Sequence, residues 1–102
     1  MIDLITRQQD KIAEHCRRLN VRRLDVFGSA VNGNFNPDTS DLDFLVDFVD
    51  HDKPGIFNRY FDLVDSLEAM FNRKVDLVEA QAVSKPRFRA NLEATKEMVY
   101  VS

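Results

Sequence analysis

Hydrophobic residues in the first fifth of the chain recur with the period of a helix. One apolar stripe runs through residues 3–19 at spacings of seven, four and three, made of Ile5, Ile12, Cys16 and Leu19. Charged and amide residues separate these positions, and Asp3 is placed to act as an N-cap. The pattern predicts an amphipathic helix over residues 3–19.

The next two segments have the composition and period of strands. Residues 21–27, VRRLDVF, are rich in β-branched and apolar side chains and run directly into Gly28. Residues 30–40 contain Gly, Pro and polar turn formers, so they have room for at most one helical turn. Residues 41–48 then alternate without a fault, with apolar side chains at Leu42, Phe44, Val46 and Phe48. This alternation predicts a strand with one face in the core and one acidic face.

The second half of the chain predicts a helix, a strand and a final helix. From Ile56 onward, apolar residues recur at spacings of three and four: Phe57, Tyr60, Phe61, Val64, Leu67 and Phe71. Because this spacing is helical, we interpret the aromatic residues among them as core residues rather than as a surface that stacks on bases. The run KVDLVEA predicts a third strand.

The C-terminal segment predicts a helix that begins after Ser84, with Pro86 in its first turn. Its expected stripe consists of Phe88, Leu92, Thr95 and Val99. The tail VYVS is expected to add a short edge strand.

Length and composition predict one small domain over residues 1–102, since no linker or repeat divides the chain. The net charge of −3 disfavours non-specific attraction to nucleic acid or anionic lipid. Cys16 is the only cysteine, and His15 and His51 add no zinc-like spacing, so a reducing compartment fits best. With no signal peptide or membrane span in the sequence, we expect a cytoplasmic protein.

The candidate chemistry lies in three aspartates. Asp41 and Asp43 are two residues apart, so a strand places both carboxylates on one face, and Asp76 is a lone acid inside the third apolar strand. Clustered carboxylates attract Mg²⁺, and a pair of such ions suits phosphoryl or nucleotidyl transfer. Gly28 and Ser29 end the first strand in a turn whose N–H groups and hydroxyl can bind phosphate. Asp47 lies too far along its strand to share an ion with Asp41.

Plainer roles exist for each of these residues. Asp41 and Asp43 could form a solvated strand face, Asp76 could be satisfied by backbone N–H groups, and Ser29 could cap the following turn. We favour the metal site because the acids are repeated beside a Gly-Ser turn. For the remaining polar candidates, namely His15, His51, Lys85, Arg87 and Arg89, we favour ordinary surface roles.

Together these residues resemble a known family. A strand ending in Gly28-Ser29, then Asp41-x-Asp43, then a strand acid at Asp76 is similar to the pattern of polymerase-β-like nucleotidyltransferases, and of their minimal branch in particular. The likeness extends from VFGSAVNG through SDLDFLVDF to KVDLVEA, and it is closest to the antitoxins that partner HEPN-domain toxins. It implies an α/β (α+β) fold with a small mixed sheet of three to four strands flanked by helices.

The resemblance also implies roles. Gly28 and Ser29 would hold nucleotide phosphates, Asp41, Asp43 and Asp76 would bind two Mg²⁺ ions, and Asp76 would help to activate the attacking hydroxyl. The implied reaction moves AMP from ATP to a hydroxyl, which in this branch is a tyrosine of the HEPN toxin, and no nucleic acid or membrane takes part.

Another candidate, transfer to an aminoglycoside-like small molecule, ranks last of three because such enzymes usually need an added domain.

The rival hypothesis is an antitoxin that only binds its toxin, alone or within an oligomer. Many relatives carry arginines in the turn after Gly28-Ser29, whereas residues 30–33 here are Ala-Val-Asn-Gly. A domain that only binds would have no need of three acids on one face, which favours the enzyme.

Overall fold

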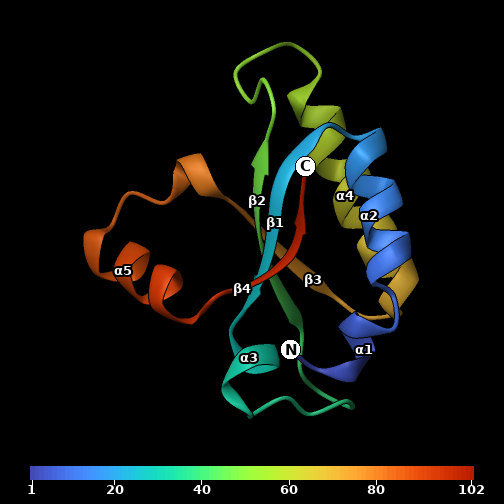
Figure 1. The fold of residues 1–102 in the computed structure, drawn as a ribbon, viewed down its shortest axis with the longest axis vertical. Helices are drawn as coiled ribbons and strands as arrows, with labels where there is room; N and C mark the ends of the chain where they lie inside the picture. The colour runs from blue at the N-terminus through green and yellow to red at the C-terminus, as the bar shows by residue number, and fades with distance from the viewer.

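A single mixed four-stranded sheet organises the computed structural model, which describes residues 1–102 (Figure 1). The elements are α1 (Asp3–Thr6), α2 (Gln9–Arg18), β1 (Val21–Phe27), α3 (Ser29–Asn32), β2 (Leu42–Phe48), α4 (Ile56–Phe71), β3 (Val75–Glu79), the 3-10 turn η1 (Ala80–Ala82), α5 (Pro86–Thr95) and β4 (Glu97–Val101). The strand order is β3-β2-β1-β4, with β1 antiparallel to β2 and β4, and β2 parallel to β3. This confirms the predicted mixed α/β architecture.

The main core lies between the sheet and helices α2 and α4, which stand together on one side of it (Figure 1). The four apolar residues that alternate along β2 are all fully buried: Leu42, Phe44, Val46 and Phe48. The predicted stripe of the first helical segment is buried as well: Ile5, Ile12, Cys16 and Leu19. The period of the hydrophobic residues therefore correctly predicted the core-facing side of β2 and of the first helical segment. The other face of β2 is not purely acidic, as we expected, because Leu45 is also buried there, in a cluster with Val83 and Leu92.

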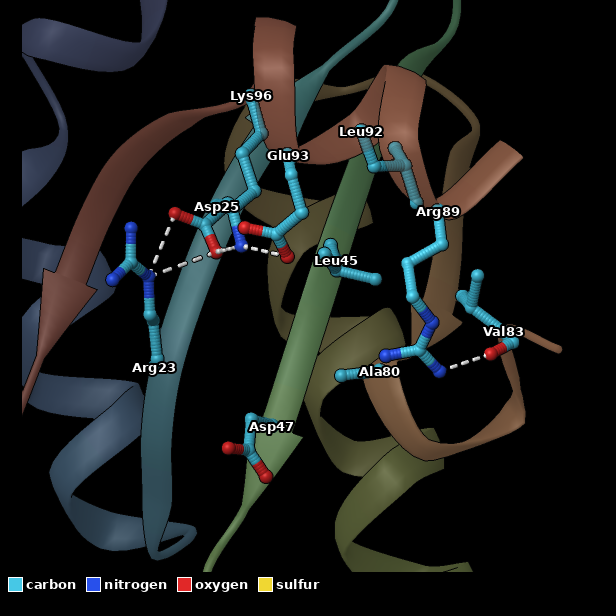
Figure 2. A pocket seen from close by; sticks show the side chains of 10 residues that line it. All are labelled: Arg23, Asp25, Leu45, Asp47, Ala80, Val83, Arg89, Leu92, Glu93 and Lys96. Carbon is cyan, nitrogen blue, oxygen red and sulfur yellow. Dashed lines mark hydrogen bonds and ion pairs between the residues drawn. The ribbon is translucent and has the colours of Figure 1, made fainter. Parts of the chain in front are cut away.

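Helix α5 lies on the opposite side of the sheet (Figure 1). A small apolar cluster of Leu45, Val83 and Leu92 joins it to β2. Beside this cluster Asp25 is only 2% exposed, and its carboxylate accepts hydrogen bonds of 3.0 Å from Arg23 Nε and lies 3.7 Å from Lys96 Nζ (Figure 2). A buried carboxylate is costly unless it is paired, so this network links the end of α5 to β1.

The first helical segment is not one helix, as we expected, but two. α1 ends at Thr6 and α2 begins at Gln9. The Thr6 hydroxyl donates a hydrogen bond of 3.3 Å to the carbonyl of Ile2, a contact that bends helices. Asp3 is the first residue of α1 and does not cap it, since the N-cap position is Ile2.

The C-terminal prediction was wrong in two details. Ser84 is not the N-cap of α5; that position belongs to Lys85, whose backbone is extended, as is usual for a residue before proline. Val99 does not continue the stripe of α5, because the helix ends at Thr95 and Val99 lies in β4. The expected edge strand is confirmed and begins at Glu97.

The interpretation of the aromatic residues of α4 also needs correction. Phe71 is buried as expected and Tyr60 is partly buried, but Phe57 is 70% exposed and Phe61 is 46% exposed. Leu63, Leu67 and Phe71 fill the positions of α4 that face the sheet. The rings of Phe57 and Phe61 therefore lie outside the core, where they contact each other with their centroids 4.7 Å apart. None of the helices has both the length and the hydrophobicity needed to cross a membrane.

Candidate active site

The fold brings two of the predicted acids into register. β2 and β3 run parallel with Asp43 opposite Asp76, and Phe27 of β1 lies opposite Asp43 on its other side. Because the neighbouring apolar residues Leu42, Phe44 and Leu77 point into the core, both acids lie on the other face of the sheet. The side chain of Asp43 is partly buried, whereas Asp76 is exposed.

Gly28 lies directly against Asp43. Its backbone has a φ of 73° and a ψ of −143°, a conformation that residues with a Cβ rarely adopt. A Cβ at this position would lie 2.4 Å from Oδ2 of Asp43, closer than atoms can approach. Only glycine therefore allows the chain to turn from β1 into α3 while the carboxylate keeps its place.

Ser29 follows Gly28 and is the first residue of α3. The carbonyl of Gly28 accepts hydrogen bonds from the N–H groups of Val31 and Asn32, at 3.0 and 3.1 Å. This short turn fixes Ser29 beside the sheet, where its side chain is partly buried. Of the two residues predicted to bind phosphate, the structure thus places Gly28 against Asp43 and Ser29 directly after it, at the start of α3.

Asp41 is less tightly placed than the sequence pattern indicated. β2 begins at Leu42, so Asp41 precedes the strand, and its side chain is exposed. No three acids, or acids with His or Cys, are gathered closely enough to hold a metal ion together. None of the three aspartates makes an ion pair.

The electrostatics of Asp43 nevertheless suit a cation. Burial raises the pKa of the Asp43 carboxyl above its ordinary value, and the charges of Asp76 and Asp41 raise it further. All three causes disfavour the negative charge of Asp43. A bound divalent cation would counter each of them, and carboxylate and phosphate oxygens are the ligands that Mg²⁺ prefers. The residue types therefore suit Mg²⁺, although the three side chains do not form a closed set of ligands.

Two residues that the sequence analysis did not assign to the site bond the backbone beside these acids. The hydroxyl of Tyr60 donates a hydrogen bond of 2.6 Å to the carbonyl of Leu77, next to Asp76. Burial and the nearby charges of Asp76 and Glu79 raise the pKa of Tyr60. No sequence pattern indicated this contact, because the helical spacing of Tyr60 suggested only a core role.

The second is Arg73, which supports the segment before Asp41. Its guanidinium donates a hydrogen bond of 3.1 Å to the carbonyl of Ser40 and lies 5.1 Å from the centre of the Phe35 ring. Within the same segment, the Ser40 hydroxyl accepts a hydrogen bond of 2.9 Å from the N–H of Asn36. A single arginine before a strand is too common to have been noticed in the sequence.

Comparison with known proteins agrees with this geometry. The family model described as "Nucleotidyltransferase domain" matches residues 9–100. The protein adenylyltransferase MntA of Thermococcus cleftensis is 37% identical over 84 residues, which cover 82% of this chain and 78% of that protein.

Two solved structures share the fold. One, assigned to a minimal nucleotidyltransferase, has a TM-score of 0.75 at 28% identity and covers 94% of this chain and 95% of that chain. The other is the MNT antitoxin in complex with a tri-AMPylated HEPN toxin of Shewanella oneidensis, with a TM-score of 0.66 over 96% of this chain and 73% of that one. At 18% identity, the second likeness concerns the fold alone. On the strength of the family match and the relative from Thermococcus, this chain belongs to the nucleotidyltransferases, as one of the minimal members of that enzyme family.

Proposed function

We propose that the protein is an antitoxin that transfers AMP from ATP to a tyrosine of a HEPN-type toxin. The observation that carries this proposal is the register that sets Asp43 beside Asp76, with Gly28 against the carboxylate of Asp43. The name of the Thermococcus relative and the AMPylated toxin bound to the Shewanella antitoxin support the reaction and a HEPN toxin as the acceptor protein. The choice of tyrosine rests on the family resemblance.

In this proposal the residues of the chain position the reactants. The acceptor hydroxyl gives its proton to the Asp76 carboxylate as its oxygen forms a bond to the α-phosphorus of ATP. The bond from that phosphorus to the bridging oxygen breaks, and pyrophosphate leaves. Gly28 and Ser29 bind the phosphates, and the carboxylates of Asp41, Asp43 and Asp76 hold Mg²⁺. A bound Mg²⁺ would supply positive charge for the phosphate oxygens and would lower the pKa of the acceptor hydroxyl.

The place of the reaction follows from the same residues. Cys16 is free and buried, which fits the reducing cytoplasm. With Asp43 and Asp76 on one face of the sheet, Asp41 exposed just before β2, and an overall charge of −3, the site suits a protein acceptor better than a nucleic acid.

The test uses ATP labelled at the α-phosphate, Mg²⁺ and a HEPN-family toxin as acceptor. The native protein is expected to leave label on the toxin, and an Asp41→Asn, Asp43→Asn double variant is not. Asp47→Asn is the matched control, since this acid lies on the same strand but is hydrogen-bonded to Gln81 at 2.5 Å and remote from Gly28. Toxin that is bound and silenced with no label from either protein would instead support the antitoxin that only binds.

A further inference from the structure

A hollow of about 280 Å³ lies between α3 and α5, next to the acidic site. Gly28 lines the hollow and also lies against the Asp43 carboxylate, so the two regions meet at this residue. Pockets for drug-sized ligands measure roughly 300–1,000 Å³. A hollow just below that range suits one part of a ligand whose remainder lies elsewhere.

The lining of the hollow has no charged side chain. Phe27, Val31 and Phe88 provide apolar surface, and the amides of Asn32 and Asn91 provide the main polar groups. Phosphate groups would find no cation there, whereas a flat and uncharged aromatic ring would find complementary surface. The hollow therefore matches the base of a nucleotide rather than its phosphates.

Phe88 is the residue best placed to stack on such a ring. It is 42% exposed, although it belongs to the stripe we expected to be buried. Its ring meets that of Phe27 edge to face, with the centroids 6.4 Å apart and the planes at 73°. This contact orients Phe88 from the sheet side and leaves much of its ring open to a ligand.

Asn91 follows Phe88 by three residues, so both side chains lie on the same side of α5. Its side-chain amide makes only one hydrogen bond, in which its oxygen accepts from the Thr95 hydroxyl at a long 3.5 Å. The same hydroxyl donates a shorter bond of 2.7 Å to the backbone carbonyl of Asn91. The side chain of Asn32, in contrast, already accepts a hydrogen bond of 3.0 Å from the N–H of Asn34. An asparagine amide can donate to and accept from the adenine edge at once.

We propose that this hollow binds the adenine base of ATP, with Phe88 stacking on the base and Asn91 forming hydrogen bonds to its polar edge. The inference rests on the proposed nucleotidyl transfer, and it identifies the residues that select the nucleotide. The phosphates at Gly28-Ser29 and the base in the hollow then belong to a single bound molecule.

The test measures binding of ATP and of inorganic tripolyphosphate by calorimetry, each with Mg²⁺ and without a toxin. Stacking on an aromatic side chain is worth about 1–3 kcal/mol per base, so Phe88→Ala should weaken ATP binding roughly 5- to 150-fold. Tripolyphosphate binding should not change, because it has no base. Phe61→Ala is the matched control, since Phe61 is 46% exposed on α4 and should leave ATP binding unchanged.

Two further variants separate recognition from folding. Phe88→Tyr keeps an aromatic ring and should restore ATP binding, and Asn91→Ala should reduce the preference for ATP over GTP. If Phe88→Ala binds ATP as tightly as the native protein does, the base site is elsewhere while the transferase proposal stands. If the native protein binds neither ATP nor tripolyphosphate, the proposed function fails, and this inference fails with it.

Discussion

Gly28→Ala is the sharpest single test of how the fold holds its reactive carboxylate. The new Cβ would lie 2.4 Å from Oδ2 of Asp43, whereas ordinary contact begins at 3.4 Å. The carboxylate must therefore move by about 1 Å, and a displacement of this size near a reacting centre costs about 100-fold in rate. The positive φ of Gly28 adds backbone strain of about 1–3 kcal/mol.

Gly33→Ala provides the matched control. Gly33 also has a positive φ, of 85°, but no atom lies within 4 Å of the position its Cβ would occupy. Both variants should unfold at a lower temperature than the native protein, by roughly 4–8 °C for each kcal/mol of strain. Only Gly28→Ala should also displace the carboxylate of Asp43.

The assay compares initial rates of AMP transfer at saturating ATP and toxin, with melting temperatures measured by circular dichroism. We expect Gly28→Ala to be about 100-fold slower than the native protein and Gly33→Ala to keep most of the rate. Equal rates in the two variants would refute the reasoning, because backbone strain would then explain the whole effect and the contact with Asp43 would not matter.

Three further predictions concern stability and reactivity. In EDTA, Asp43→Asn should melt at a higher temperature than the native protein at pH 7. The raised pKa of Asp43 makes its charge a cost in the folded state above that pKa, so the gain should fade as the pH falls toward 3.8; a gain that does not change with pH would contradict this. Tyr60→Phe removes the hydrogen bond to the Leu77 carbonyl and should lower the free energy of unfolding by about 1 kcal/mol in urea titrations, and an unchanged value would show that water replaces it. Burial raises the pKa of Cys16 to about 12, so its thiol should react with Ellman's reagent only after denaturation, and rapid reaction of the native protein would disprove its burial.

The sequence predicted the strands and core faces well because their signals are local. The alternation of residues 41–48 is a property of one strand, and the four apolar residues of its core face are all fully buried. The break at Thr6 and the exposure of Phe57 and Phe61 were missed for the opposite reason. The break involves the Thr6 hydroxyl, which bonds the carbonyl of Ile2. The exposure of Phe57 and Phe61 depends on how wide a face of α4 the sheet covers. Neither follows from the spacing of apolar residues.

The same distinction applies to the site. Asp41, Asp43 and Asp76 could be selected from the sequence, but not the register that sets Asp43 opposite Asp76, because it depends on which strands are neighbours. The contact of Phe27 with Phe88 joins β1 to α5, from opposite halves of the chain. Such contacts form only when the whole sheet is assembled, so sequence periodicity carries no signal for them.

The alternation along β2 also explains how so small a protein tolerates an unfavourable cluster of charges. Its inward residues, such as Phe44 and Val46, are fully buried and contribute to stability, while Asp43 on the other face carries a charge that the fold disfavours. Because successive side chains of a strand point to opposite faces, the two roles share a backbone but no side-chain contacts. Substitutions of Asp43 should therefore affect the reaction without loosening the core. Phe44→Ala, in contrast, should lower the free energy of unfolding by about 3–5 kcal/mol and abolish both the packed core and the activity.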